Sequence, residues 1–468
     1  MKLPGFIDSH LHMLGLGYYA SLIDLSQAKS IKEVQDILRN NMPNNILIGR
    51  GWNQDQFQEN RIITKHDLHK VSTEIPIVIT RACGHVLVAN DKMMEIAGID
   101  ISTRQVSGGD FSYTNGIFSE KALGLITDHL PKPTKNHLKK YFIKANQILL
   151  KNGITSIASD DFCVFDIPYN DIIEVLRELY KEDLIQVKIT EQVNLPKSQF
   201  IDFLNNGYAN KKINEKLKMG PLKILADGSL GGRTAYLSEA YADDKNNYGI
   251  NTFSDKELFD LVHLADKNNI DVAIHTIGDQ ATQQAIDAIK KSLEITKREN
   301  HNHALVHAQL TRKDQILEMQ KYNIGAIVQP IFINTDIKIV EKRLGERKNN
   351  AYLFKTMDEF LDLGFSTDAP VEPVNPFYNL YSALTYKSIK YPNLPSLNKG
   401  QCFSVKQALK AYTDNNLKYI YLDKLDESDY IIIEEDIFSL EVERIKDIKV
   451  KQTIINGKIV YNQDKKTL

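Results

Sequence analysis

The sequence predicts an α/β fold: a TIM-like (β/α)8 barrel with a β-rich insertion after its first strand and a small β-sheet domain made by its C-terminal strands. Three observations support this fold class. After about residue 150, short apolar runs alternate with longer amphipathic stretches, which is typical of βα units around a parallel sheet. A long segment separates the first apolar run from the second, and a hairpin signal lies near the C-terminus.

Eight apolar runs are expected to form the barrel, with helical patterns such as Asp255–Asn268 and Gln280–Glu294 between several of them. The expected strands are Phe6–His10, Ile154–Ser159, Val187–Val193, Leu222–Ala226, Val272–Thr276, Ala304–Ala308, Gly325–Gln329 and Gly364–Thr367. An open doubly wound sheet is the alternative. Such a sheet normally carries a Gly-rich phosphate turn after its first strand, and Asp8-Ser9-His10-Leu11-His12 does not resemble one.

The segment from about Asn41 to Thr127 is too long for one crossover helix and indicates an inserted subdomain. Its apolar run Ile75–Thr80 and its turn Ser107-Gly108-Gly109-Asp110 favour β structure. We expect residues 1–40 to hold the first barrel strand and the start of the insertion, 41–130 the inserted β-rich subdomain, and 131–415 the rest of the barrel.

Residues 416–468 are expected to form the small β domain. Tyr430–Glu434 and the hairpin Thr453–Tyr461, which turns at Asn456-Gly457, are its expected strands.

Composition excludes some partners. The chain has 468 residues and a formal net charge of -2, so no overall field favours nucleic acid or an anionic membrane. No stretch approaches the roughly 18 apolar residues of a membrane span, and no signal-peptide pattern follows Met1. We therefore expect a cytoplasmic protein with a small-molecule substrate. Cys83, Cys163 and Cys402 are far apart and are expected to be reduced thiols.

His10 and His12 are the first candidates for chemistry. They are two residues apart on a strand, so both side chains leave the same face and can converge on one metal ion. The pair lies at the carboxyl end of the first strand, the edge of a barrel at which catalytic groups collect. A single His-x-His motif is weak evidence by itself.

Three further candidates follow later strands. His275 and His307 each close an apolar run, and Asp368 follows the eighth strand. Taken singly, each histidine reads as a buried core residue and Asp368 as a turn or a helix cap. Together with His10-Leu11-His12, they indicate a metal site.

The other histidines do not form a competing set, and we interpret them as surface or capping residues. They are His66, His69, His129, His137, His263, His301 and His303. His301-Asn302-His303 precedes its strand and should point to the opposite end of the barrel.

With these residues assembled, the chain resembles the amidohydrolase superfamily, and within it amidohydrolase family 3, the YtcJ-like and N-substituted formamide deformylase-like metal-dependent hydrolases. The likeness covers nearly the full length. The strings that carry it are Pro4-Gly5-Phe6-Ile7-Asp8-Ser9-His10-Leu11-His12, Gly51-Trp52-Asn53-Gln54-Asp55, Arg81-Ala82-Cys83-Gly84-His85, Lys223-Ile224-Leu225-Ala226-Asp227-Gly228-Ser229-Leu230-Gly231, His275-Thr276-Ile277-Gly278-Asp279 and Ser366-Thr367-Asp368-Ala369-Pro370.

The resemblance adds Lys223 to the ligand set, because many members carry there a lysine that reacts with CO2. The resulting carbamate is an anion able to bridge two divalent ions. Without the resemblance, a lysine on a buried strand whose ammonium reaches solvent or pairs with Asp227 is the preferred interpretation. The resemblance thus implies one or two ions, most simply Zn2+, held by His10, His12, carboxylated Lys223, His275, His307 and Asp368.

The resemblance also implies that Trp52, His85 and Arg233 line the substrate pocket. Without it, Trp52 reads as a core aromatic residue, His85 as a capped or buried imidazole and Arg233 as half of a surface ion pair. Family members usually have several strands before the first barrel strand, whereas here only Met1-Lys2-Leu3 precede Pro4. Either the small sheet is built mainly from the C-terminal segment, or its first strands are missing. An uncovered sheet edge would make a homodimer a reasonable hypothesis.

The function implied is hydrolysis of a non-peptide carbon–nitrogen bond in an amide, such as an N-formyl or N-acyl amine. Metal-activated hydroxide would attack the carbonyl carbon, and Asp368 would act as general base and then as general acid. Deamination of a ring amidine or opening of a cyclic amide on the same scaffold is the main rival. A barrel that has lost catalysis and serves as a binding protein is the third hypothesis.

Overall fold

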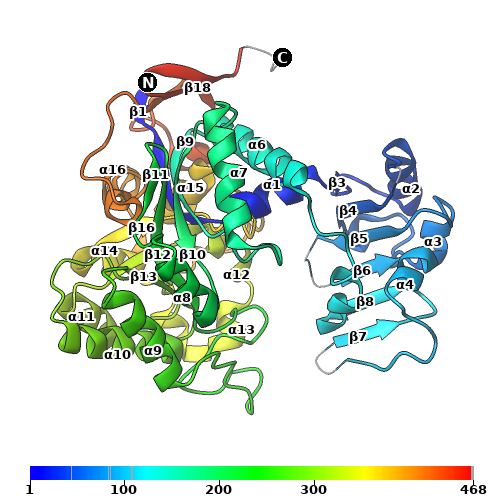
Figure 1. The fold of residues 1–468 in the computed structure, drawn as a ribbon, viewed down its shortest axis with the longest axis horizontal. Coiled ribbons are helices and arrows are strands. Elements are labelled where there is room, and N and C mark those ends of the chain that lie inside the picture. The colour runs from blue at the N-terminus through cyan, green and yellow to red at the C-terminus, as the bar shows by residue number, and fades with distance from the viewer. Residues whose placement is uncertain (44, 83, 85, 107–108, 465–468) are drawn as a thin grey trace. The chain divides into compact units, whose positions relative to one another are not determined.

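The computed structural model describes residues 1–464, apart from residues 44, 83, 85, 107 and 108. The chain forms two compact units (Figure 1). One consists of Met1–Leu16 with Lys135–Leu468, and the other of Gly17–Thr134. Cys83, His85 and the Ser107-Gly108 half of the expected turn lie outside the described residues.

The larger unit is built on a parallel barrel, which confirms the predicted fold class. Its eight strands are hydrogen-bonded in the order β16-β15-β14-β13-β12-β10-β9-β2, and the short β11 pairs antiparallel with β12. The bounds are β2 Phe6–Leu11, β9 Ile154–Ser159, β10 Lys188–Val193, β11 Lys212–Asn214, β12 Leu217–Leu225, β13 Val272–Thr276, β14 Ala304–His307, β15 Gly325–Val328 and β16 Leu363–Phe365.

Burial explains why these segments form a parallel barrel. Every residue of β2, β9, β14, β15 and β16 is buried, so both faces of these strands are covered. Strands covered on both faces are apolar along their length rather than alternating, as the sequence of Gly325–Val328 illustrates. Buried polar residues also occur within these strands, such as Asp8 and Ser9 in the middle of β2.

Helices follow the barrel strands and cover the sheet. Their bounds are α1 Met13–Ser21, α6 Lys135–Lys151, α7 Tyr169–Lys181, α8 Lys197–Asn205, α9 Asp255–Asp266, α10 Asp279–Thr296, α11 Lys313–Lys321, α12 Ile333–Asp336, α13 Val340–Leu344, α14 Phe354–Phe360, α15 Pro376–Thr385 and α16 Val405–Ala411. Capping fixes some of their starts: Ser254 and Glu257 form a capping box at α9. No helix in the described part of the chain is long and apolar enough to cross a membrane.

The barrel closes where β16 meets β2. The Asp368 amide donates to the His10 carbonyl at 2.9 Å, and the His12 amide donates to the Ala369 carbonyl at 2.8 Å. Beneath these bonds, Asn416 of the 3-10 segment Asp414–Ile420 donates its Nδ2 to the carbonyls of Ile7 and Phe365, at 2.6 and 2.7 Å. The last join of the barrel is therefore made by the segments that carry candidate ligands.

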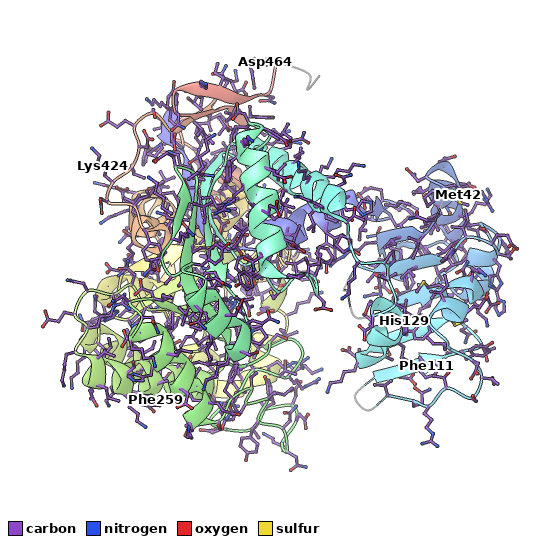
Figure 2. The ribbon with its side chains drawn as sticks, in the orientation of Figure 1. Met42, Phe111, His129, Phe259, Lys424 and Asp464 are labelled. Atoms are coloured by element: carbon purple, nitrogen blue, oxygen red, sulfur yellow. The ribbon has the colours of Figure 1, made fainter. Side chains whose placement is uncertain are left out.

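The smaller unit is an insertion with a six-stranded mixed sheet in the order β3-β4-β5-β6-β8-β7. Its bounds are β3 Ile23–Asp24, β4 Leu47–Trp52, β5 Ile77–Arg81, β6 Val86–Ala89, β7 Gly109–Ser112, β8 Ile117–Glu120, α2 Ile31–Asn40, α3 Lys65–His69, α4 Asp91–Ile96 and α5 Gly124–Thr127. Two apolar clusters fill it, one around Trp52 and Phe57 and the other around Phe111 and Phe118 (Phe111 in Figure 2).

A four-stranded antiparallel sheet, in the order β1-β17-β18-β19, belongs to the larger unit. Its bounds are β1 Lys2–Pro4, β17 Tyr430–Ile433, β18 Val450–Ile455 and β19 Lys458–Asn462. The C-terminal segment supplies three of these strands, and β1 adds the fourth through pairing of Leu3 with Ile431. The predicted hairpin turns at Asn456, which has a φ of 50°, and Gly457, which has a φ of 72°.

Candidate metal centre

The centre of the site is a carboxylate between two imidazoles. His10 Nε2 lies 3.3 Å from Asp368 Oδ1, and His12 Nε2 lies 3.2 Å from the same oxygen. His307 joins this group, because the ligand atoms of His10, His307 and Asp368 all lie within 4.8 Å of one another. Three barrel strands that are distant in sequence thus converge on one point.

A glutamine fixes which nitrogen of His10 faces that point. Gln192 Nε2 donates to the Ser9 carbonyl at 3.2 Å, so its Oε1 is the atom that faces His10 Nδ1 at 2.7 Å. An amide oxygen only accepts, so His10 Nδ1 carries the hydrogen and donates it. The lone pair of neutral His10 is therefore on Nε2, the atom directed at Asp368.

The same arrangement recurs at His307 and His12. Gln329 donates its Nε2 to Ser366 Oγ at 2.6 Å and accepts from His307 Nδ1 at 2.7 Å. His12 Nδ1 donates to the backbone carbonyl of Asp160 at 2.8 Å. Partners on the far nitrogen orient metal-binding histidines in this way and raise their basicity as ligands. All three imidazoles consequently present Nε2.

His275 is held by its other nitrogen. Its Nε2 lies 2.9 Å from the Gly228 carbonyl and 3.4 Å from Asp227 Oδ1, two acceptors. Nε2 therefore carries the hydrogen, and Nδ1 holds the lone pair. Its ring lies edge-on to that of His307 with the centroids 4.4 Å apart. Asp227 is fixed by backbone amides, including that of Gly278 at 2.8 Å, so it is not a partner for Lys223.

Lys223 is buried on β12, with 2% of its surface exposed. Asp160 Oδ2 lies 4.0 Å from the Lys223 Nζ. This distance is beyond that of a hydrogen bond. Its positive charge contributes to lowering the pKa of both His10 and His275. A buried ammonium beside histidines is unfavourable, and carboxylation would replace it with an anion.

Burial and neighbouring charges favour neutral His275 and His307 and ionised Asp368, which are the forms that bind a cation. Burial first, and then the charge of Lys223, lower the pKa of His275 to about 3. Burial and His275 hold the pKa of His307 well below its usual value. Burial raises the pKa of Asp368, but His10 and His12 outweigh it and hold that pKa well below its usual value.

His12 behaves differently from the other histidines. Burial lowers its pKa, but Asp368, Cys163 and Asp160 outweigh burial, and the net pKa lies well above the usual value. In the arrangement described, His12 would therefore hold an extra proton, which a metal ion would displace.

Two of these residues have backbone conformations that side chains rarely adopt. His307 has a φ of 73° and Asp368 a φ of 57°. Such left-handed residues cost on the order of 1 kcal/mol each and cluster at functional sites. His307 is the last residue of β14, and Asp368 comes three residues after the end of β16.

The donor set fits a divalent cation. The Nε2 atoms of His10 and His12 converge on Asp368 Oδ1, which is buried and has no hydrogen-bond partner among the described residues. Facing lone pairs repel unless a proton or a cation lies between them. Imidazole nitrogens with one carboxylate oxygen are the usual ligands of zinc and related transition metals.

All eight barrel strands contribute to this centre, in three ways. The ends of β2, β12, β13, β14 and β16 carry the six ligands expected from the sequence. Gln192 and Gln329, at the ends of β10 and β15, orient two of the imidazoles, and Asp160, after β9, contacts His12 and Lys223. These three residues were not among the site residues predicted from the sequence. The available signal was a polar residue closing an otherwise apolar strand, as Gln329 does.

Of the three residues expected in the substrate pocket, the two that the structure describes have partners within the protein. Trp52 is fully buried in the core of the insertion, where its Nε1 donates to the Ile79 carbonyl at 3.3 Å. Arg233 makes a two-point ion pair with Asp243, at 3.2 and 3.0 Å. His85 lies outside the described residues. Substrate contact by these three residues stays a prediction.

One interpretation of the remaining histidines is wrong. His303 is fully buried, and His301 is 8% exposed, so neither is a surface residue. His303 Nδ1 accepts from the Val272 amide at 3.1 Å, and its Nε2 lies 3.3 Å from Asp266 Oδ1. They precede β14 and lie at the amino ends of the strands, as the sequence indicated. A buried carboxylate partner supplied by α9 could not be read from the local sequence.

A parallel barrel with imidazoles and a carboxylate gathered at the carboxyl ends of its strands has the architecture of a metal-dependent hydrolase. The chain belongs to the amidohydrolase family, whose family model, Amidohydro_3, matches residues 1–461.

Two relatives and one solved structure illustrate the likeness. The putative amidohydrolase YtcJ of Bacillus subtilis (strain 168) is 30% identical over 98% of this chain and 89% of its own length. The N-substituted formamide deformylase of Arthrobacter pascens is 20% identical over 98% of this chain and 88% of its own length. An uncharacterized metal-dependent hydrolase from Pyrococcus horikoshii OT3 superposes with a TM-score of 0.79 at 30% identity, covering 94% of this chain and 87% of that one.

Proposed function

We propose that the protein hydrolyses a carbon–nitrogen bond outside peptides, in an N-formyl or N-acyl amine. The observation that carries the proposal is the convergence of His10 and His12 Nε2 on the orphaned Oδ1 of Asp368. The choice of an amide is supported by full-length similarity to a relative named N-substituted formamide deformylase.

The residues that would hold the metal are His10, His12, Lys223, His275, His307 and Asp368, with zinc the ion that best suits nitrogen ligands. Bound divalent ions supply a Lewis acid for the carbonyl oxygen and make water nucleophilic near neutral pH. Carboxylation of Lys223 would remove a buried positive charge from the ligand set and add two oxygens. Gln192 and Gln329 hold the imidazoles of His10 and His307 in the required orientation.

Asp368 has the central role in proton transfer. Its carboxylate accepts the proton of the attacking water and then delivers it to the leaving nitrogen, so that the amine departs neutral. A general base that becomes a general acid needs a carboxylate ionised at the start, and His10 and His12 keep the pKa of Asp368 low. Its buried position limits proton exchange with solvent during the step.

The test is a substrate panel with protein purified in zinc and bicarbonate. N-formyl amines, N-acyl amines, cyclic amides and ring amidines are compared, with carboxylate and ammonia release measured separately. We expect carboxylate and a free amine from a formyl or acyl amine. Ammonia from a ring amidine would replace the proposal with a deaminase. Less than about half an equivalent of metal per chain would instead favour a binding protein without catalysis.

Asp368→Asn tests the proton role. The variant should bind metal and lower kcat by about 10²- to 10⁴-fold, because the amide cannot take up the proton. Asp362→Asn is the matched control, since Asp362 is an exposed carboxylate paired to Lys418 at 2.6 Å. Wild-type turnover by Asp368→Asn would contradict this role.

A further inference from the structure

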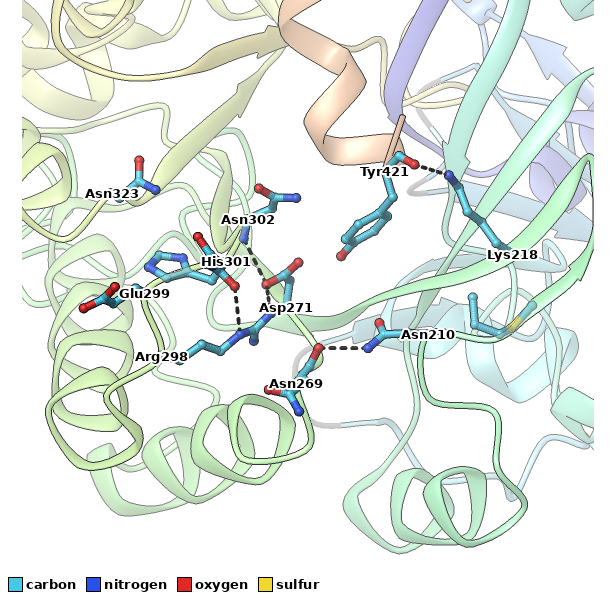
Figure 3. A pocket seen from close by; sticks show the side chains of 12 residues that line it. Asn210, Lys218, Asn269, Asp271, Arg298, Glu299, His301, Asn302, Asn323 and Tyr421 are labelled. Carbon is cyan, nitrogen blue, oxygen red and sulfur yellow. Dashed lines mark hydrogen bonds and ion pairs between the residues drawn. The ribbon is translucent and has the colours of Figure 1, made fainter. Parts of the chain in front are cut away.

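A polar cavity lies at the opposite end of the barrel from the candidate metal centre. It has a volume of about 570 Å³ and is lined by residues that precede β13, β14 and β15 and by the start of β12 (Figure 3). Lys218, which lines the cavity, precedes Lys223 on β12 by five residues, roughly 16 Å along a strand. A ligand in this cavity would therefore not touch the metal ligands.

Lys218 is the unusual residue of this cavity. Its Nζ donates to the Tyr421 carbonyl at 2.7 Å, as Figure 3 shows, and it forms no ion pair with a carboxylate of the described residues. Neighbouring lysines differ: Lys188 pairs with Asp429 at 2.6 Å and Lys212 with Glu215 at 2.7 Å. A smaller cavity of about 310 Å³ also has Lys218 and Tyr421 among its lining residues.

The charge of Lys218 is partly desolvated but present at neutral pH. Burial first, and Lys212 second, lower its pKa to about 8, while Asp423 acts in the opposite direction. An ammonium with two unused N–H groups beside a cavity is suited to an anion.

The acids of the cavity do not compete for this ammonium. Asp271 Oδ1 accepts from Arg298 Nη2 at 2.7 Å and from the Asn302 amide at 3.0 Å. Arg298 is itself anchored to Asp266 at 3.2 Å, so both charges form a fixed wall. Glu299 is exposed. Lys218 thus remains the cation of this cavity that has no carboxylate partner within the described structure.

The rest of the lining supplies neutral hydrogen-bonding groups. His301 Nδ1 accepts from the His303 amide at 3.3 Å, so its Nε2 carries the hydrogen in the neutral ring. Side-chain amides of Asn269, Asn300 and Asn323 line the same space. Such groups pair with hydroxyl and carbonyl oxygens rather than with apolar surface.

We propose that this cavity is a second ligand site that binds a small hydroxycarboxylate or dicarboxylate, with one carboxylate on Lys218 and the polar remainder on His301 and the asparagines. The site is independent of the metal centre and of the proposed reaction. It lies at the foot of β12, β13 and β14, the strands whose other ends carry Lys223, His275 and His307.

Isothermal titration calorimetry tests the proposal with malate and citrate as probes, and with inorganic phosphate and glycerol for comparison. The full-length protein is used before and after treatment with a chelator. We expect malate or citrate to bind more tightly than about 1 mM, in both states of the protein, with no measurable binding of glycerol. Carboxylate binding that disappears on chelation would place the anion at the metal centre and overturn the proposal. Equal binding of phosphate would overturn the ligand class.

Variants locate the site. Lys218→Met keeps the side-chain volume and removes the charge, and should weaken carboxylate binding at least tenfold. Lys212→Met is the matched control and should bind like wild type. Asn323→Gly supplies a second test that leaves the lysine in place and should weaken binding severalfold, whether or not Lys218→Met folds; glycine suits the φ of 54° at this position. Unchanged binding in both Lys218→Met and Asn323→Gly would overturn the proposal.

Discussion

In the candidate metal centre, hydrogen bonds to Nδ1 of His10 and His307 determine which ring nitrogen each histidine can offer to a metal ion. Gln192 and Gln329 accept from Nδ1 of His10 and His307, and each amide is in turn fixed by a donor bond of its own. Both glutamines would act through the imidazoles that they orient, so they are positioning residues. Their loss should change ring orientation before it changes the chain fold.

Gln329→Leu tests this positioning. Loss of the acceptor leaves Nδ1 of His307 without a partner in a buried site, so the neutral ring can adopt the other tautomer. We expect metal affinity to fall by about 10- to 100-fold, measured by competition with a chromogenic chelator. Gln315→Leu is the control, because Gln315 is equally buried but its Nε2 donates to the Asp279 carbonyl at 2.7 Å. Equal losses in both variants would contradict a specific role.

Glu372 makes the stability of the protein depend on pH. Burial raises the pKa of Glu372 from 4.5 to about 7, and Thr335 Oγ1 donates to its Oε1 at 2.8 Å. The folded state therefore binds more protons than the unfolded state between these pH values. The sign follows from linkage: this group's contribution is fully present below pH 4.5 and is lost as pH rises through about 7.

Glu372→Gln cannot ionise and should remove this loss. Relative to wild type, we expect its free energy of unfolding to be higher at pH 8 than at pH 4.5 by up to about 3 kcal/mol. Urea unfolding at the two pH values measures the difference. The exposed Glu346→Gln should track wild type, and a pH-independent offset for Glu372→Gln would contradict the assignment.

Much of the site could be predicted at this scale, because the ligand residues end apolar strands and occur in recognisable strings such as His10-Leu11-His12. The structure brings these candidates together, while their roles as ligands stay proposals. Gln192, Gln329 and Asp160 could not be ranked above other polar residues. Their importance depends on which imidazole they face across the barrel, and that pairing is set by strand register.

At the scale of elements, the barrel strands were predictable because burial on both faces makes them short runs rich in apolar residues. Ile154–Ser159 and Val272–Thr276 have the predicted bounds. The eighth strand ends at Phe365 rather than Thr367, because Ser366 onward leaves the sheet to bring Asp368 to the centre. The short strands β3 and β11, which were not predicted, form through tertiary pairing and have no local sequence pattern.

The join between β16 and β2 depends on Asn416, which bonds to the carbonyls of both strands. Asn416→Leu removes this donor from both buried carbonyls, of which that of Phe365 still accepts from Ser9 Oγ at 3.1 Å, so we expect a loss of about 1 to 3 kcal/mol in the free energy of unfolding. Chemical denaturation measures the loss. Asn415→Ala removes one bond, to the Leu363 carbonyl, at a half-exposed position and should cost less than about 1 kcal/mol. Similar losses in the two variants would contradict this account.

At the scale of the whole molecule, the chain consists of two units with separate cores. The insertion has its own six-stranded sheet and its own apolar clusters. It also contains the single tryptophan of the sequence, Trp52, fully buried. Tryptophan fluorescence therefore reports on the insertion alone, whereas far-ultraviolet circular dichroism reports on both units.

We expect residues 17–134 produced alone to fold cooperatively, with the buried tryptophan emission of the intact protein. Thermal unfolding followed by fluorescence and by circular dichroism should give coincident transitions for this fragment. Trp52→Phe, which keeps an aromatic core residue, should remain folded, whereas Trp52→Ala should lose about 3 to 5 kcal/mol. A fragment with solvent-exposed emission and no transition would show that the insertion needs the rest of the chain.

The bonds between the Asp368 amide and the His10 carbonyl, and between the His12 amide and the Ala369 carbonyl, also have a consequence during protein synthesis. At bacterial or eukaryotic elongation rates, roughly 20 to 70 s pass between the emergence of His10 and that of Asp368 from the ribosome. Throughout that time the first strand has no eighth strand to bond with. We therefore expect the candidate ligand set to be complete only after Asp368 has been synthesised, with the first strand lacking its eighth-strand partner until then.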